Sequence, residues 1–206
     1  MKLNSDSFAN GQPIPPRIAM ARKDGAADTF SDNRNPHLAW SDIPSGTRSF
    51  ALLCIDPDAP TVAAMVGKAG IDIPVDQVRT DVVHWAMADI PADVREIAEG
   101  AWSHGVTVGG KPDPQGPHPA RHALNDYTGW FAGDAAMRGD YRGYDGPFPP
   151  SNDLRMHRYF FRLFALDVAQ LELPARFTAG DVLRAMQGHV RAEALTHGTY
   201  SSHAGS

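Results

Sequence analysis

The chain has 206 residues, a length at which all-β proteins often form one domain. Its 17 prolines and 19 glycines favour short strands and shaped loops over a helical bundle. The net charge of −5, without a run of lysine and arginine, disfavours nucleic-acid binding, which requires neutralisation of phosphates. The single cysteine, Cys54, excludes an internal disulfide.

The ends and the overall pattern of the chain give three further expectations. The first residues lack the apolar core of a signal peptide, and no later apolar run reaches membrane-span length. We therefore expect a cytoplasmic protein without stable membrane anchoring. There is no internal repeat and no linker, so residues 1–206 are predicted to form a single domain.

Apolar, branched and aromatic stretches between turn signals predict the strands. In chain order they are Ile14–Ala21, Asn35–Trp40, Ser49–Ile55, Val82–Asp89 and Met156–Asp167. The first is expected at a sheet edge because of its two prolines, and the third is apolar enough to be covered on both faces. In the fourth, alternation places His84, Ala86 and Ala88 on one face, and Trp85 and Met87 on the other.

Two stretches predict helices. Pro91–Gly100 begins with proline and ends with glycine, which is typical of a short helix. The main helix is expected over Thr178–His197, with Thr178 as its cap, Asp181 in the first turn and Gly198 at its end. The apolar positions with helical spacing in that stretch are Leu183, Met186, Val190 and Ala194.

The remaining segments are predicted to be loops. Residues 22–35 and 102–121 are rich in turn residues, and the short stretch 124–130 is ambiguous. Residues 61–81 have a weak pattern and are expected to form a long excursion, which in compact domains is often functional or part of a contact surface.

The stretch from Tyr141 to Asp167 combines a stiff loop with a strand. Its prolines stiffen residues 141–150, and its glycines, including Gly146, allow close approach of the backbone to a ligand. In the strand that follows, His157 and Tyr159 point the same way, at the mouth of an apolar face. The pattern predicts a recognition surface.

Three places carry chemically useful side chains near predicted strand ends: Asp56 with Asp58, His84, and His157 with Tyr159. Taken alone, the segment Asp56-Pro57-Asp58 is equally well interpreted as a turn in which the aspartate side chains accept hydrogen bonds from the turn's own amides. His84 reads more readily as a buried core histidine.

Four motifs follow one another as Asp56–Pro60, His84–Trp85, Tyr144–Pro150 and His157–Tyr159. In this order and context they resemble the phosphatidylethanolamine-binding protein family, also called Raf kinase inhibitor protein-like, and in particular its bacterial branch. Supporting segments are Asn35–Trp40, Leu124–Trp130, Ala165–Asp167 and Gly198–Tyr200. Any one motif is weak, but four in register are specific.

The resemblance implies an antiparallel β-sandwich with a few peripheral helices, including one near the C-terminus, and a small preformed pocket for phosphate or phosphorylated headgroups. Asp56 and Asp58 would lie in the pocket wall, His84 and His157 would face each other across it, and Tyr159 would offer its hydroxyl. Gly146 and Pro147 would form the rim. The full set of implied ligand-binding residues is Asp56, Asp58, Pro60, His84, Tyr144, Gly146, Pro147, His157 and Tyr159.

Two departures from the family pattern are present. Residues 61–81 are longer than in the shorter eukaryotic members, which could alter the pocket or build a subunit contact. His37 stands at a position that is usually not charged, and the sequence offers no interpretation of it.

An anion beside two carboxylates is unfavourable unless protons or donors intervene. We expect each histidine to be held by an aspartate through one ring nitrogen while the other nitrogen donates to the anion. Binding should then tighten as the pH falls from about 8 toward 6.

Other functions stay open at this stage. The Asp and His residues suit acid–base catalysis, as in a hydrolase, or a metal site, but no nucleophile motif or tight ligand pair is present, so we expect neither catalysis nor a cofactor. A protein–protein regulator, like a kinase or protease inhibitor, is the second hypothesis. The resemblance also suggests a homodimer, with Trp102, Trp130 and Phe131 as contact residues or simply as core.

Overall fold

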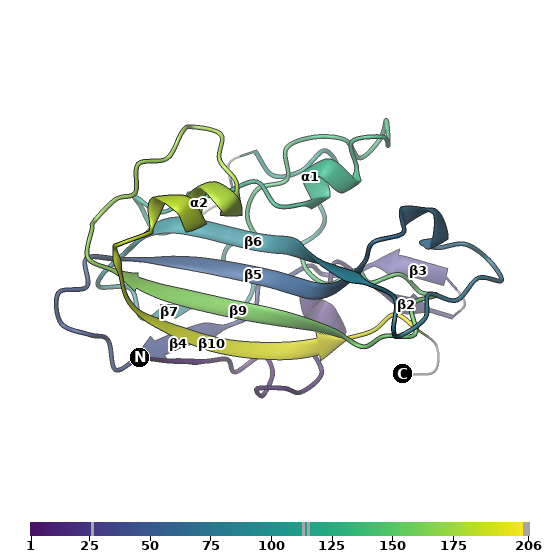
Figure 1. Cartoon of the computed structure of the whole chain (residues 1–206), viewed down its shortest axis with the longest axis horizontal. Helices are drawn as coiled ribbons and strands as arrows, with labels where there is room; N and C mark the ends of the chain where they lie inside the picture. Colours follow the sequence, from purple (N-terminus) through teal and green to yellow (C-terminus); the bar gives the residue numbers. More distant parts are fainter. Residues whose placement is uncertain (26, 113, 115, 204–206) are drawn as a thin grey trace.

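The structure is a computed structural model that describes residues 1–25, 27–112, 114 and 116–203. A five-stranded antiparallel sheet, ordered β10-β9-β5-β6-β8, runs through its centre (Figure 1). Its strands are β5 (Ser49–Pro60), β6 (Arg79–Pro91), β8 (Arg121–His122), β9 (His157–Leu166) and β10 (Val190–Tyr200).

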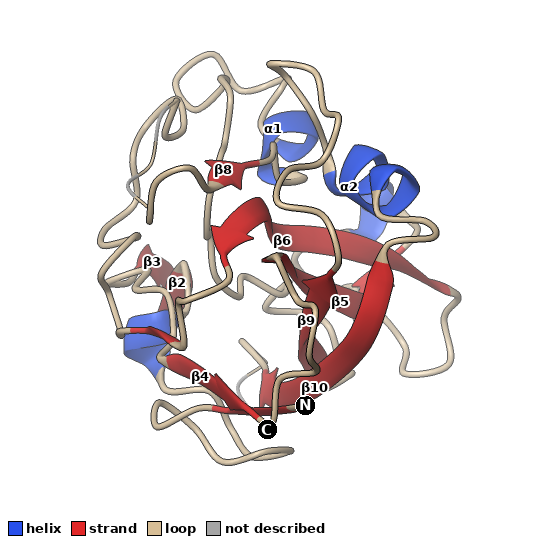
Figure 2. Ribbon diagram, turned by 90° about the vertical axis from the view of Figure 1, so that its left-hand side faces the viewer, coloured by secondary structure: helices blue, strands red, loops and turns tan. Residues whose placement is uncertain are grey.

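A smaller antiparallel sheet, ordered β1-β4-β7, covers one face of the central sheet. It contains β1 (Lys2–Asn4), β4 (Leu38–Ser41) and β7 (Glu96–Ile97), and a separate hairpin pairs β2 (Ala21–Asp24) with β3 (Ala27–Phe30). The helices are α1 (Tyr127–Trp130), α2 (Ala179–Ala185) and the short 3-10 turns η1 (Pro16–Ile18) and η2 (Ala63–Met65). Figure 2 shows α1 and α2 on the side of the central sheet away from β4.

The core has two layers because both faces of the central sheet are apolar. Trp40 of β4 packs edge-on against Phe50 of β5, with ring centroids 5.5 Å apart. On the other face, Val182 and Met186 at α2 pack with Leu53. Burying side chains of this size contributes roughly 1.5–3 kcal/mol each. The predicted antiparallel β-sandwich is confirmed.

β5 and β6 are longer than predicted. The sequence predicts that the first strand ends at Ile55, yet β5 continues to Pro60: pairing with β6 resumes beyond an irregularity, with Ala59 opposite Thr80. Pro57 lacks an amide donor, and the irregular stretch accommodates it without ending the strand. The excursion between the two strands therefore spans residues 61–78.

A bulge in β6 corrects the predicted facing of His84. Cys54 pairs with Trp85 and Ile55 with Val83, so His84 is the extra residue between two paired positions. Its ring lies 5.1 Å from that of Tyr159, whereas Ala86 and Ala88 pack on the opposite face of the sheet. The bulge thus turns the imidazole away from the alanine face on which strict alternation would place it.

The first predicted strand, Ile14–Ala21, is wrong. Its prolines instead start the 3-10 turn η1, which buries Ile18. The predicted loop 22–35 is also only partly correct, because β2 and β3 form a hairpin there; Gly25 has φ +63° at its turn.

The helix predicted over Pro91–Gly100 is absent among the described residues: that stretch forms a turn followed by β7, whose Ile97 pairs with Leu38. The stretch Thr178–His197 is helical only at its start. Thr178 and Asp181 form the capping box that begins α2.

After α2, Gly188 adopts φ +82° and the chain enters β10, which pairs along the whole of β9. The long partner strand overrides the helical spacing of the apolar residues. The predicted helix end, Gly198, lies inside β10.

No helix in the described part of the chain is long and apolar enough to cross a membrane.

Candidate functional site

A cavity of about 390 Å³ lies at one end of the central sheet, where β5, β6 and β9 meet α1 and the 148–151 loop. This volume is typical of small-molecule sites. Its polar lining residues are Asp28, Asp56, Thr80, His84, Asp126, Tyr127, Ser151, His157 and Tyr159. The apolar lining and backbone come from Ala59, Pro60, Val66, Gly67, Val82, Trp130, Phe148, Pro149 and Pro150.

The structure brings together five of the residues that the sequence singled out: Asp56, Pro60, His84, His157 and Tyr159 all line this cavity. They meet because β5 and the two strands that pair with it, β6 and β9, have ends at this edge of the sheet. The Tyr159 ring stands between the two histidines, 5.1 Å from His84 and 6.5 Å from His157 by ring centroids.

Four other predicted pocket residues, Asp58, Tyr144, Gly146 and Pro147, do not line the cavity, and this part of the expectation is corrected. The side chain of Asp58 is turned to Arg158, whose Nε donates to it over 2.8 Å. Burial alone would raise the pKa of Asp58, but its arginine partners lower it.

The 144–147 stretch supports the cavity wall from behind. Tyr144 donates its hydroxyl to the Ile18 carbonyl at 3.0 Å, and the Pro147 carbonyl accepts from the Met20 amide at 2.9 Å. A Cβ on Gly146 would overlap the Ile18 carbonyl oxygen, so only glycine fits this close approach. The 144–147 stretch thus packs on the N-terminal segment, and the next four residues, 148–151, line the cavity.

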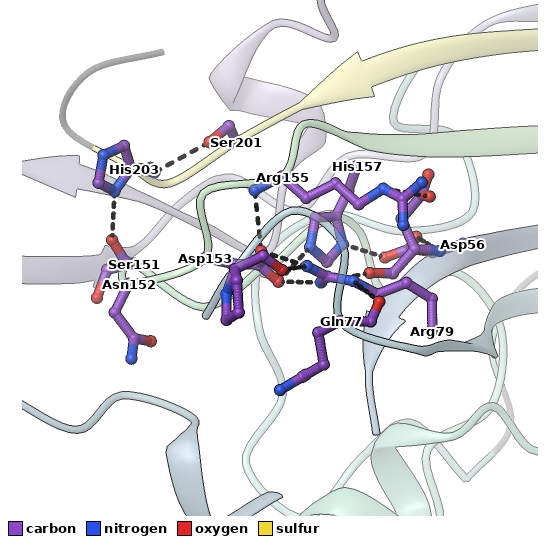
Figure 3. Close-up of polar contacts among 12 residues, drawn as sticks. Asp56, Gln77, Arg79, Ser151, Asn152, Asp153, Arg155, His157, Ser201 and His203 are labelled. Atoms are coloured by element: carbon purple, nitrogen blue, oxygen red, sulfur yellow. Dashed lines mark hydrogen bonds and ion pairs between the residues drawn. The ribbon is translucent and has the colours of Figure 1, made fainter. Parts of the chain in front are cut away.

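His157 is clamped between two carboxylates (Figure 3). Its Nδ1 lies 2.7 Å from Asp56 Oδ2, and its Nε2 lies 3.1 Å from Asp153 Oδ2. Burial alone would lower the pKa of His157, but hydrogen bonds to Asp153 and Asp56 raise it to about 9. Both ring nitrogens then donate, and the ring is an imidazolium at neutral pH.

This geometry corrects the expectation that each histidine offers one nitrogen to an anion. In His157 both nitrogens are used by carboxylates, so its role is to neutralise the floor of the cavity. Asp153 is itself paired with Arg79, whose Nη2 lies 3.0 Å from Oδ1. Burial would raise the pKa of Asp153, but its bonds to His157 and Arg79 lower it to about 2.

His84 has a different environment. Its Nδ1 lies 2.9 Å from the backbone carbonyl oxygen of Asp145, so that nitrogen carries the proton and donates, and Nε2 is left for the cavity. Burial lowers the pKa of His84 below the ordinary value of 6.5, even though nearby carboxylates act in the opposite direction. At neutral pH the ring is therefore uncharged.

Asp145 is fixed in turn by a buried network. Lys111 Nζ lies 2.6 Å from its Oδ1, and amides of Asn33 and Asn125 donate to its two carboxylate oxygens at 2.8 Å each. This network positions the carbonyl group that orients His84. Sequence reasoning missed it, although Asp145 stands inside the Tyr144–Pro150 motif.

Tyr159 contributes the most informative polar atom. The side chain is 1% exposed, and its hydroxyl has no hydrogen-bond partner within the described part of the chain. Burial raises its pKa well above the ordinary value, so the phenol stays protonated and can donate. A buried hydroxyl without a partner costs free energy unless a ligand or water satisfies it.

The thiol of Cys54 is poorly placed to act as a nucleophile. Cys54 is fully buried in β5, and burial raises the pKa of its thiol well above the ordinary value, which opposes formation of the reactive thiolate. Among the described residues, no group of three or more His, Cys, Asp or Glu side chains is arranged to hold a metal ion.

The fold and the cavity together define a β-sandwich protein with a preformed site at the end of its central sheet. The chain belongs to the phosphatidylethanolamine-binding protein family, whose model matches residues 4–201. Membership supports a ligand-binding role.

Similar proteins come from bacteria and archaea. A UPF0098 protein of Aquifex aeolicus is 32% identical, covering 97% of this chain and 88% of its own length. One from Methanothermobacter thermautotrophicus is 33% identical, covering 97% and 98%. YbhB of Escherichia coli is 31% identical, covering 84% and 82%.

Two solved structures share the fold. The phosphatidylethanolamine-binding protein homologue CT736 of Chlamydia trachomatis has a TM-score of 0.65 and 27% identity, covering 97% of this chain and 96% of its own. Escherichia coli YbcL has a TM-score of 0.68 and 24% identity, covering 97% of each chain. These matches confirm the bacterial branch that the four motifs indicated.

Proposed function

We propose that the protein binds a small ligand through an oxyanion group such as phosphate, seated between Tyr159 and His84, without a covalent step. The observation that carries this proposal is the buried, protonated hydroxyl of Tyr159, a cavity-lining residue, which has no hydrogen-bond partner among the described residues. A charged acceptor would satisfy it, and hydrogen bonds to charged groups are the strong ones.

The charges of the cavity decide the conditions of binding. Among the described residues, its lining includes the carboxylates of Asp28, Asp56 and Asp126 but neither lysine nor arginine. His157 neutralises Asp56, so the proton that an anion requires must come to His84 Nε2. Because the pKa of His84 is below 6.5 in the free protein and a bound anion raises it, affinity should rise as the pH falls through the pKa of the complex. It should level off only below the lower pKa of the free protein.

The mouth of the cavity suits the rest of a phosphorylated headgroup. Asp126 and the Trp130 ring, which is 57% exposed, both come from the α1 region and line the cavity. A carboxylate beside an aromatic face favours an ammonium group. Phosphoethanolamine carries both charges and is the first ligand to test.

Tyr159→Phe removes the hydroxyl and leaves the ring in place. In calorimetry at pH 6, we expect its affinity for phosphoethanolamine to fall by about tenfold or more, because a hydrogen bond to a charged group is lost. Tyr200→Phe is the matched control, since the Tyr200 hydroxyl donates to the Ala21 carbonyl and does not line the cavity.

Equal affinities of Tyr159→Phe and the wild type would contradict the proposed seat for the oxyanion. If the wild type binds neither phosphate nor phosphoethanolamine, the proposal of an oxyanion ligand fails altogether.

A further inference from the structure

The 61–78 segment forms part of the cavity, because Val66 and Gly67 line it. Packing does little to hold this segment in place. Ile73 is the only buried residue of this segment. The aliphatic side chains of Val62, Val75 and Val78 are exposed and do not pack in the core. With so few buried contacts, the position of such a segment depends on its hydrogen bonds.

Those hydrogen bonds converge on Asn152. Its Oδ1 accepts from the Gly67 amide at 3.0 Å, and its Nδ2 donates to the carbonyl oxygens of Met65 and Ile71 at 2.9 and 2.6 Å. The Ile73 amide also donates to the Asn152 carbonyl at 2.8 Å. One side chain therefore holds the lining residue Gly67 and the backbone on both sides of it.

Asp153, the next residue in the same loop, holds the far end of the segment through Arg79. Arg79 pairs with Asp153 and donates to the carbonyl oxygens of Pro74 and Gln77 at 2.8 and 3.2 Å. Asp153 also binds His157 at the cavity floor. Figure 3 shows these side chains converging around Asp153. The loop before β9 thus fixes the 61–78 segment and the floor together.

We propose that Asn152 is a specificity-determining residue, which fixes the 61–78 segment as a wall of the cavity and thereby sets the largest ligand that the site admits. This inference rests on the proposed function for its ligand class. Asn152 does not line the cavity and acts only by positioning Gly67 and Val66.

The test compares phenyl phosphate with 1-naphthyl phosphate, which carry the same anionic group on bodies of different size. Asn152→Ala removes three side-chain hydrogen bonds and frees the wall. The affinity for 1-naphthyl phosphate should then rise about three- to tenfold relative to the affinity for phenyl phosphate. The backbone amides of residues 65–73 should exchange hydrogen about tenfold faster. Asn152→Asp retains the acceptor for Gly67 but not the two donors, and we expect an intermediate effect.

Asn10→Ala is the matched control. The Asn10 side chain accepts from the His197 amide and lies outside the cavity lining, so both readouts should stay at wild-type values. An unchanged ratio of the two affinities in Asn152→Ala would overturn the assignment, and so would unchanged exchange. If the wild type binds neither phosphate, the proposed function fails, whereas faster exchange in Asn152→Ala would still support Asn152 as the anchor of the wall.

Discussion

His157 is charged at neutral pH because two carboxylates outweigh its burial, and this charge is tied to stability. The pKa is 6.5 for an ordinary histidine and about 9 in the folded protein. The stabilisation is therefore fully present below pH 6.5 and is lost as the pH rises through about 9.

We expect the free energy of unfolding to fall between pH 7 and pH 9.5, by about 3 kcal/mol at most. Chemical denaturation at a series of pH values measures it. His157→Gln should be less stable at pH 7 and should show a flatter dependence. His189→Gln is the control, because His189 is bound to Asp167 at the surface and lies outside the clamp, so the loss of stability toward pH 9.5 should persist. If the free energy of unfolding of the wild type stays constant up to pH 9.5, the charged contact of His157 with Asp56 and Asp153 is refuted.

At the residue scale, the sequence indicates the functional side chains that belong to recognisable motifs. It does not indicate those that lie outside such motifs. His84, His157 and Tyr159 could be named from their strand-end positions. Arg79 and Asp153 are 74 residues apart, and each stands in a stretch without a distinctive pattern. Their meeting depends on how the excursion folds back, which local pattern does not encode. For the same reason the second carboxylate on His157 could not be foreseen.

At the scale of elements, β10 shows why local spacing can mislead. Val190 and Ala194 are four apart, which fits a helix, but both lie in β10, where an irregularity after Val190 leaves Val190 exposed and Ala194 buried. The choice is made by the tertiary partner. Only the start of α2 could be read locally, since a capping box is a local interaction.

Gly198 offers a test of that packing. A Cβ at this position would lie 2.4 Å from Ile14 Cγ1 and 3.1 Å from a ring carbon of Phe8, so Gly198→Ala should destabilise the protein by about 1–3 kcal/mol. Thermal or urea unfolding measures the effect. Gly129→Ala meets nothing within 4 Å and should cost no stability. Equal stabilities of the two variants would contradict the packing of the N-terminal segment on β10.

At the scale of the whole molecule, the sequence predicts the fold class but not the order of strands. The apolar run in β5 implies cover on both faces, and the structure places β5 between β6 and β9. That order joins segments more than a hundred residues apart, as in the pairing of Ser49 with Leu166. The prediction of a β-sandwich came from the family resemblance and not from the periodicity of the sequence.

The single domain, the homodimer and the cytoplasmic location stay predictions. Of the proposed contact residues, Trp130 is exposed, Trp102 is partly buried against the core and Phe131 is buried. Only Trp130 is free to serve a subunit contact. The same ring lines the cavity mouth, so a partner there would also affect ligand entry.

The central claim is that an oxyanion binds beside Tyr159 and places a proton on His84. NMR titration of the His84 ring, with and without saturating phosphoethanolamine, tests it most directly. We predict a pKa below 6.5 in the free protein and a higher pKa in the complex, since the anion favours the charged ring. A His84 pKa that saturating ligand leaves unchanged would contradict the account.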